Sequence, residues 1–470
     1  MPRPNSLLRA ARERLPSTVA PGEHASRAEV AEAVNEWLWQ TTRRRYVLDA
    51  HYLAKLERGV ARWPNASYRT GLRHVLGAAD DAALGFTPAR RTVSGPRPQA
   101  AAPLPPWDTG LVIERVSSVT DYDLMPPSCR RLLTGMATLV GAALVRELQP
   151  LLWPVAREAA SSGAAFSPPE LDAADRLVRV LRSWHSAHGA LSRPTVIAQL
   201  GAHVRRLRAA PQGTPESLRA FRIGAELADI AATMSWDAGE HAAAQRYFML
   251  ATQLAHIAGD DTLAAVALAS LARQCFDLGR PDDGLEVVQL AQYGTRNSAT
   301  PRLRAVLATR EAWAHAQRGE AAAFRRAVGL AEDYHSEGVC ELDLRTPSTR
   351  SLDGAELAGI IGARYRDLAR HDPKHARTAQ DYIGRALRLR PADRARNRVF
   401  DLVGLARAHL ITREPDQAAA LIHDALPSAA TWAAGRVGAR LRDFHREAAA
   451  FAAEPDVRDA RDAIAVLVAA

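Results

Sequence analysis

The sequence predicts an all-α protein in which a small N-terminal helical domain precedes a long array of helical hairpins. Aromatic residues make up only 6% of the 470 residues and alanine is abundant, which favours close helix packing through small side chains. Few stretches show the alternating β-branched pattern of strands. Apolar residues instead recur at helical spacing, and Gly239, Gly279 and Gly319 recur at an interval of 40 residues.

Composition excludes several classes of protein. The three cysteines, Cys129, Cys275 and Cys340, are odd in number and far apart, so they offer neither a disulfide framework nor a Cys-x-x-Cys metal site. No apolar segment reaches the roughly 18 to 20 residues of a membrane span, and the N-terminus has no apolar signal-peptide core. We therefore expect a cytoplasmic protein without membrane contact.

Positive charge is concentrated at the N-terminus. Residues 1–91 contain 15 Arg and Lys against 9 Asp and Glu, which is +6 of the total formal charge of +9. A polyanion is the partner that such a field attracts.

Four helices are predicted between residues 5 and 77. The first covers residues 8–15. The second begins at Ser26, because Ser26 and Glu29 have the spacing of a capping box, and it extends through Trp39 or ends before a loop at residues 43–45. Its expected buried stripe is Val30, Val34, Trp37 and Leu38.

The third helix is predicted from Asp49, its N-cap, to Arg58. Its expected inward residues are Leu53, Leu56 and Val60, and its opposite face carries His51, Lys55 and Arg58. A fourth helix should begin near Asn65 and stop at Gly77. Its expected inward residues are Tyr68, Leu72, Val75 and Leu76.

The third helix has the character of a DNA-reading helix. It is short, has the small Ala50 in its first turn, and presents polar groups outward, as entry into a major groove requires. Residues 43–73 carry eight basic side chains against Asp49 and Glu57. The expected DNA-binding residues are Arg43, Arg44, Arg45, Ala50, His51, Lys55, Arg58 and Arg62. The arginines would supply phosphate contacts and the outward face of the helix would read bases.

Three segments resemble a known family. LRAARERL at 8–15, SRAEVAEAV at 26–34 and LDAHYLAKLERG at 48–59 are similar to the first, second and recognition helices of XRE-type (phage-repressor-like) helix-turn-helix regulators. The resemblance implies base reading by Ala50, His51 and Lys55 and a backbone contact by Arg58, and Glu57 and Gly59 match the family's E-x-G ending. The chain departs from the family in one respect, because about a dozen extra residues separate the second and third helices.

The rest of the chain divides by composition. Residues 92–106 hold five prolines and predict an exposed linker between a DNA-binding domain at 1–91 and a connector at 107–170, which could include a short extended piece. Residues 171–470 predict helical hairpins that resemble tetratricopeptide repeats. The resemblance rests on Ala244, Phe248 and Ala251 in the first unit, and a later unit has Glu414 in place of the glycine.

No motif indicates an enzyme or a cofactor. The two lysines, Lys55 and Lys374, do not follow glycine, so there is no P-loop, and no nucleophile elbow or dinucleotide cradle occurs. The pairs His185/His188 and His371/His375 lack a third ligand, so we expect surface histidines. We expect Cys340 to be a buried structural cysteine.

Together these features predict a sequence-specific DNA-binding transcriptional regulator. The resemblance implies a homodimer, with the repeats serving dimerisation and sensing an effector: a small molecule, a peptide or a protein. Two alternatives stay open. One is a peptide-responsive receptor-regulator. It is disfavoured because a groove that holds a peptide backbone needs carboxamide side chains such as asparagine, and the only asparagines after residue 107 are Asn297 and Asn397. The other is a helical-repeat protein-interaction scaffold without specific DNA binding.

Overall fold

The computed structural model describes residues 4–42, 46–61, 64–86, 107–125, 137–152, 166–188, 193–433 and 435–469. It divides into two compact units, Met1–Ala101 and Ala102–Ala470. The expected linker at 92–106 lies outside the described residues. Within the described ranges the elements are helical, and the one β-type pairing is an isolated bridge between Pro16 and His24.

The first unit contains four helices: α1 (Ser6–Glu13), α2 (Arg27–Thr42), α3 (Ala50–Glu57) and α4 (Ala66–Val75). The capping signals are where the sequence predicts them. The Ser26 amide donates to Glu29 Oε2 at 2.7 Å and the Glu29 amide donates to Ser26 Oγ at 3.2 Å. The side chains of Asp49 and Asn65 cap α3 and α4 by accepting hydrogen bonds from the amides of Tyr52 and Tyr68. Local polar chemistry therefore sets where these helices begin.

The core of the first unit joins all four helices. Leu53, Leu56 and Leu72 are buried against α2, as expected. Val60 was expected to face inward, but it is 61% exposed because α3 ends at Glu57 and Val60 lies in the turn that follows.

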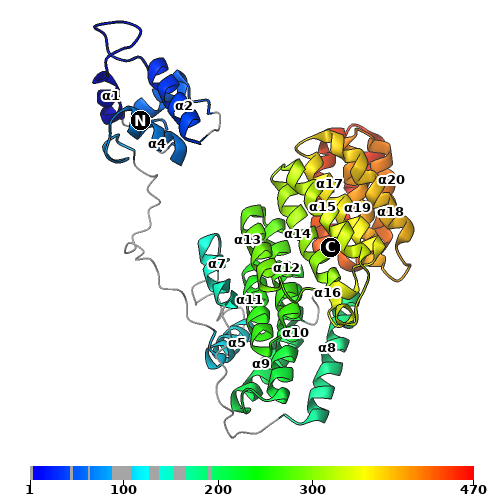
Figure 1. The fold of residues 1–470 in the computed structure, drawn as a ribbon. Helices are drawn as coiled ribbons and strands as arrows, with labels where there is room; N and C mark the ends of the chain where they lie inside the picture. The colour runs from blue at the N-terminus through cyan, green and yellow to red at the C-terminus, as the bar shows by residue number, and fades with distance from the viewer. Residues whose placement is uncertain are drawn as a thin grey trace. The chain divides into compact units, whose positions relative to one another are not determined.

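The second unit is a succession of antiparallel helices (Figure 1). Its first helices are α5 (Thr109–Leu124), α7 (Ala142–Leu148), α8 (Pro168–His188) and α9 (Arg193–Ala209). The central hairpins are made of α10 (Pro215–Asp237), α11 (His241–Ala258), α12 (Asp261–Asp277), α13 (Pro281–Gly294), α14 (Pro301–Gln317) and α15 (Ala321–Ser336). The last helices are α16 (Pro347–Arg350), α17 (Gly354–Ala369), α18 (Ala376–Leu389), α19 (Ala395–Ile411), α20 (Pro415–Ala429), α21 (Arg436–Glu447) and α22 (Pro455–Ala469).

Left-handed residues make the tight turns of the hairpins. Gly239, Gly279 and Gly319 have φ of 78°, 68° and 72°, and each follows the first helix of a pair. In the turn between α19 and α20, Arg413 takes this conformation with φ of 60°. The expectation that Glu414 replaces the glycine was therefore off by one residue, and Glu414 instead precedes α20 as its N-cap.

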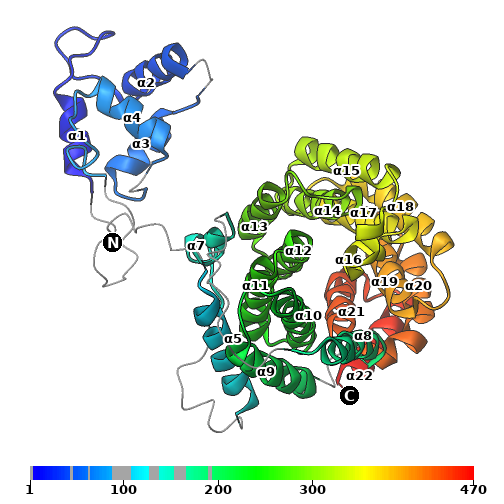
Figure 2. The same cartoon turned by 60° about the horizontal axis from the view of Figure 1, so that its bottom comes forward.

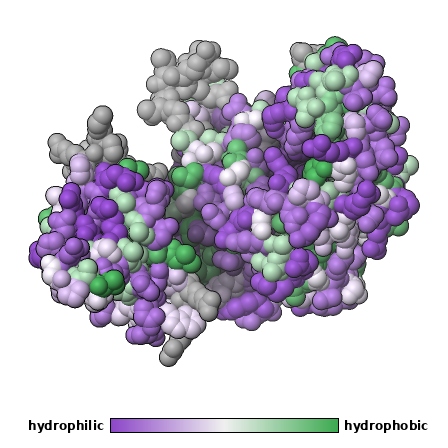
Figure 3. All heavy atoms as spheres, turned by 90° about the horizontal axis from the view of Figure 1, so that it is seen from above, coloured by the Kyte–Doolittle hydropathy of each residue, from purple (hydrophilic) through white to green (hydrophobic). Residues whose placement is uncertain are grey.

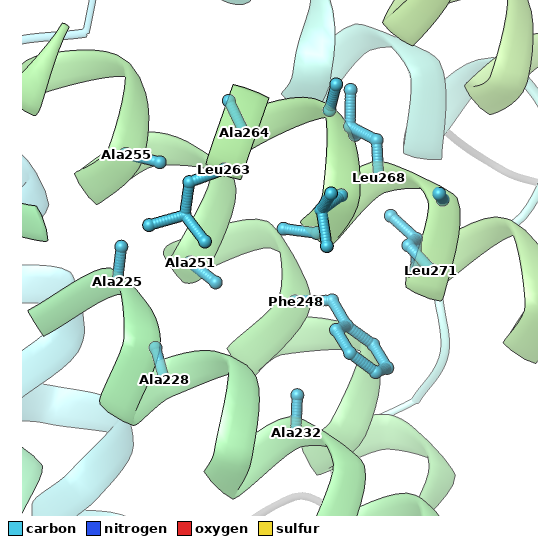
Figure 4. Close-up of a cluster of buried hydrophobic side chains, with 14 of the residues drawn as sticks. Ala225, Ala228, Ala232, Phe248, Ala251, Ala255, Leu263, Ala264, Leu268 and Leu271 are labelled. Atoms are coloured by element: carbon cyan, nitrogen blue, oxygen red, sulfur yellow. The ribbon is translucent and has the colours of Figure 1, made fainter. Parts of the chain in front are cut away.

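Small residues let neighbouring helices approach closely. In the first hairpin, Ala225, Ala228 and Ala232 of α10 lie near Ala251 and Ala255 of α11, and α12 covers the pair (Figure 4). Ala244, Phe248 and Ala251 are each at most 1% exposed. The many alanines thus allow the helices of this core to pack closely.

The connector differs from its prediction. The segment that could include an extended piece forms α5, which Asp108 caps by accepting a hydrogen bond from the Leu111 amide at 2.8 Å. Val112, Val116 and Thr120 are buried at a spacing of four residues, which is the period of a helix rather than a strand. The short α7 covers part of the expected buried helix.

Helix α21 returns to the inner side of the array. In Figure 2 the helices from α10 onward follow an arc, and α21 lies on its inner side. Arg436 of α21 forms an ion pair with Asp237 of α10, with Nε and Oδ1 2.5 Å apart, and Arg440 of α21 pairs with Asp277 of α12. Residues about two hundred positions apart in sequence therefore meet.

Hydrophilic side chains dominate the face drawn in Figure 3. None of the helices described here is both long enough and apolar enough to cross a membrane.

Candidate nucleic-acid interface

A buried carboxylate fixes the predicted recognition helix α3. Glu57, at its C-terminus, is 5% exposed. Arg12 Nε of α1 lies 2.7 Å from Glu57 Oε1, and Arg27 Nη2 of α2 lies 2.7 Å from Glu57 Oε2. The Asn5 amide also donates to the Glu57 carbonyl at 2.8 Å. One side chain thus connects three helices and sets the orientation of α3.

An asparagine fixes the other end of α3, and sequence reasoning missed it. Asn35 Nδ2 of α2 donates to the Leu48 carbonyl at 2.8 Å, and the Leu48 amide donates to Asn35 Oδ1 at 2.9 Å. Both backbone groups just before the N-cap Asp49 are therefore bound to α2. The only sequence signal for this contact is the position of Asn35, whose carboxamide side chain lies next to the buried stripe of the second helix.

The outward face of α3 carries unpaired polar groups. His51 and Arg58 are exposed and Lys55 is partly exposed. No hydrogen bond or ion pair joins these three side chains to another described residue. The structure therefore brings His51, Lys55 and Arg58 to one accessible surface, as the helical spacing predicts.

The two ends of this surface differ in charge. A groove between α2 and the beginning of α3 is lined by Glu32, Glu36, Asp49 and Ala50. Lys55 and Arg58 belong to the other end of α3. Phosphate groups would be repelled at the acidic groove and attracted at the basic end. Ala50, which the resemblance assigns to base reading, is therefore on the less favourable side.

Other basic residues of this unit have internal partners. Arg69 Nε lies 2.8 Å from Asp81 Oδ2, and Arg73 Nε lies 3.4 Å from Asp81 Oδ1. These two arginines contribute less to an exposed positive field than the sequence suggests. The remaining predicted DNA-binding residues, Arg43, Arg44, Arg45 and Arg62, lie outside the described residues.

Three predictions on other reactive groups were wrong. His185 is not on the surface but is 8% exposed, with Nε2 3.5 Å from Asp237 Oδ2. His375 is also buried, beside the ring of Tyr365. Cys340 is exposed, whereas Cys275 is buried and burial raises its pKa to about 11. Among the described residues, no group of three His, Cys, Asp or Glu side chains could hold a metal ion.

No protein-family model matches the chain. A search of functionally curated proteins finds no significant match either.

Proposed function

We propose that this chain is a cytoplasmic, sequence-specific regulator of transcription that binds double-stranded DNA through α3. The observation that carries the proposal is the set of unpaired side chains, His51, Lys55 and Arg58, on a helix that is fixed at both ends. Lys and Arg bind phosphate oxygens, and Lys, Arg and His can donate hydrogen bonds to base edges in the major groove. The resemblance to XRE-type regulators points in the same direction.

The fixed ends matter for specificity. A side chain reads a base only if its helix is held in a constant position against the backbone of the duplex. Glu57 and Asn35 hold α3 in this way through hydrogen bonds of 2.7 to 2.9 Å. A surface that bound nucleic acid by charge alone would not need this rigidity.

The proposal is tested by selecting duplexes from a random library with the full chain and measuring gel-shift affinity at about 50 and 200 mM salt. We expect an enriched, roughly palindromic sequence bound by two copies. Lys55→Ala should lower the affinity for the selected duplex by roughly 10- to 100-fold more than it lowers the affinity for random DNA. Arg58→Ala should lower both affinities equally and reduce their salt dependence.

Lys374→Ala is the matched control, because Lys374 is the chain's other lysine and lies in the second unit. It should leave DNA affinity unchanged. Absence of duplex binding at the lower salt concentration would instead favour a protein-interaction scaffold. Equal losses with Lys55→Ala on selected and random DNA would make Lys55 a phosphate contact.

A further inference from the structure

The inner side of the second unit contains a cavity whose lining is rich in arginine. It has a volume of about 170 Å³ and lies among α12, α14, α17, α18, α19 and α21. Seven arginines and three carboxylates line it. The lining residues come from helices spread over more than 160 positions of the chain, so the cavity exists only in the folded array.

Some of these arginines are neutralised by neighbours. Arg390 Nη1 lies 2.6 Å from Glu356 Oε2, and Arg390 Nη2 lies 2.6 Å from Asp401 Oδ2. Two further arginines share one carboxylate. Nη1 of Arg364 and Nη2 of Arg366 each lie 2.8 Å from an oxygen of Asp367.

Arg310 and Arg273 lack such partners. Arg310 is 8% exposed and lines the cavity. Its Nη1 donates to Thr309 Oγ1 at 3.0 Å, and its buried Nε has no hydrogen-bond acceptor. The guanidinium carbon of Arg273 lies 5.3 Å from the centre of the Trp236 ring. Neither arginine forms an ion pair with a described residue.

The two unpaired guanidinium groups also repel each other. Burial lowers the pKa of Arg310, and the charges of Arg273 and Arg364 lower it further. An arginine nevertheless stays charged at neutral pH. Glu356 acts on both groups in the opposite direction, as Asp277 and Asp237 do on Arg273. These three carboxylates already form ion pairs with Arg390, Arg440 and Arg436. The excess of positive charge is unfavourable, and an anion in the cavity would compensate it.

The walls also offer apolar surface. Trp313 lines the cavity, with the guanidinium carbon of Arg364 3.3 Å from its ring centre. The buried Nε1 of Trp313 has no hydrogen-bond acceptor. Ile360 and Phe400 supply apolar lining. At about 30 Å³ for each water, a volume of 170 Å³ holds roughly six water molecules. This size suits a small organic molecule rather than a folded or extended peptide.

We propose that the cavity binds a small organic anion whose carboxylate or phosphate head pairs with Arg310 and Arg273 and whose apolar part packs against Ile360 and Phe400. Arginine forks bind both kinds of head group bidentately. This inference does not depend on DNA binding, and it assigns a ligand class to the second unit.

The test uses the full chain without DNA and three probes: phenyl phosphate, benzoate and the neutral benzyl alcohol. Thermal unfolding and titration calorimetry are measured at equal ionic strength and millimolar probe concentration. We expect at least one anion to raise the Tm and to bind, while benzyl alcohol does neither. The tighter of the two anions identifies the head group.

Arg310→Met separates ligand binding from a structural role. Because it removes a buried charge that is only partly compensated, it should leave the Tm without ligand unchanged or raised, and it should weaken anion binding by about tenfold or more. Arg390→Met, which breaks two ion pairs, should instead lower the Tm. Arg273→Met is the second binding variant.

Two results would overturn the proposal: neither anion binding better than benzyl alcohol, or Arg310→Met and Arg273→Met both keeping full anion affinity. Because no DNA is present, a failure of the proposed DNA binding leaves this measurement unaffected.

Discussion

Glu57 shows how much one side chain decides in the N-terminal unit. Its carboxylate is paired with Arg12, whose side chain is 11% exposed, and with Arg27, whose side chain is 44% exposed. Removing the charge of Glu57 leaves the buried Arg12 with only the partly exposed Glu13 as a counter-charge, whose Oε1 lies 3.3 Å from Arg12 Nη2. A buried charge that loses its partner costs far more than an exposed one.

We therefore expect Glu57→Gln to destabilise the N-terminal unit by about 3 kcal/mol. Hydrogen exchange of residues 46–61 in the full chain measures this loss. Glu32→Gln on the exposed face of α2 is the matched control and should change stability by less than about 0.5 kcal/mol. Equal exchange in both variants would mean that Glu57 does not hold α3.

At the residue scale, the sequence predicts those side chains whose role is set within a few positions. His51, Lys55 and Arg58 share a face because a helix places them there. The pairing of Glu57 with Arg12 spans 45 positions and depends on tertiary packing. The same limit explains Cys340 and His185, because burial is decided by elements distant in the sequence.

At the scale of the helix, the capping box of α2 predicts a pH effect. Hydrogen bonds from Ser26 and Ser17 hold the pKa of Glu29 well below its ordinary value of 4.5. A carboxyl group whose pKa is lowered in the folded state stabilises that state at pH values above the group's ordinary pKa. This stabilisation is progressively lost as the pH falls below the ordinary pKa.

We expect Glu29→Gln to increase amide exchange at the beginning of α2 at neutral pH. The difference from the unmodified chain should shrink as the pH falls below 4.5. Hydrogen exchange of residues 16–34, corrected for intrinsic rates, measures it. A difference that stays constant with pH would show that the carboxylate charge is not involved.

The hairpin turns allow a matched pair of backbone substitutions. A Cβ added at Gly239 meets nothing within 4 Å, so Gly239→Ala tests only the left-handed backbone with φ of 78°. It should destabilise the chain by about 1 kcal/mol. Arg413→Gly places glycine at φ of 60° and should have the opposite sign, with a gain of at most about 1 kcal/mol. Urea unfolding measures both, and a shared sign would contradict this explanation.

Turns and caps are also the part of the fold that the sequence predicts best. Gly239, Gly279 and Gly319 mark turns because few other residues tolerate positive φ. Arg413 was missed because arginine rarely takes positive φ and nothing in the local sequence distinguishes Arg413 from other surface arginines. The arginine cavity could not be predicted at all, because its lining residues are contiguous only after the hairpins have stacked.

For the second unit as a whole, closure of the array depends on Asp237. This side chain of α10 meets Arg436 of α21 at 2.5 Å and Arg396 of α19 at 3.1 Å, and His185 of α8 lies 3.5 Å away. Burial alone would raise the pKa of Asp237, but the charges of Arg436 and Arg396 lower it below its ordinary value. The ion pairs therefore outweigh the desolvation of this carboxylate.

Asp237→Asn should therefore destabilise the second unit by about 3 kcal/mol at neutral pH, because two largely buried arginines lose their shared counter-charge. Since the folded pKa is lowered, the penalty should disappear as the pH falls below the ordinary value of 3.8. Urea unfolding of the full chain, with hydrogen exchange of α21, measures both effects. Asp282→Asn is the control: its side chain is 79% exposed, and its ion pair with Arg318 should contribute less than about 1 kcal/mol. If the two variants unfolded alike, α21 would be held by apolar packing alone and Asp237 would not close the array.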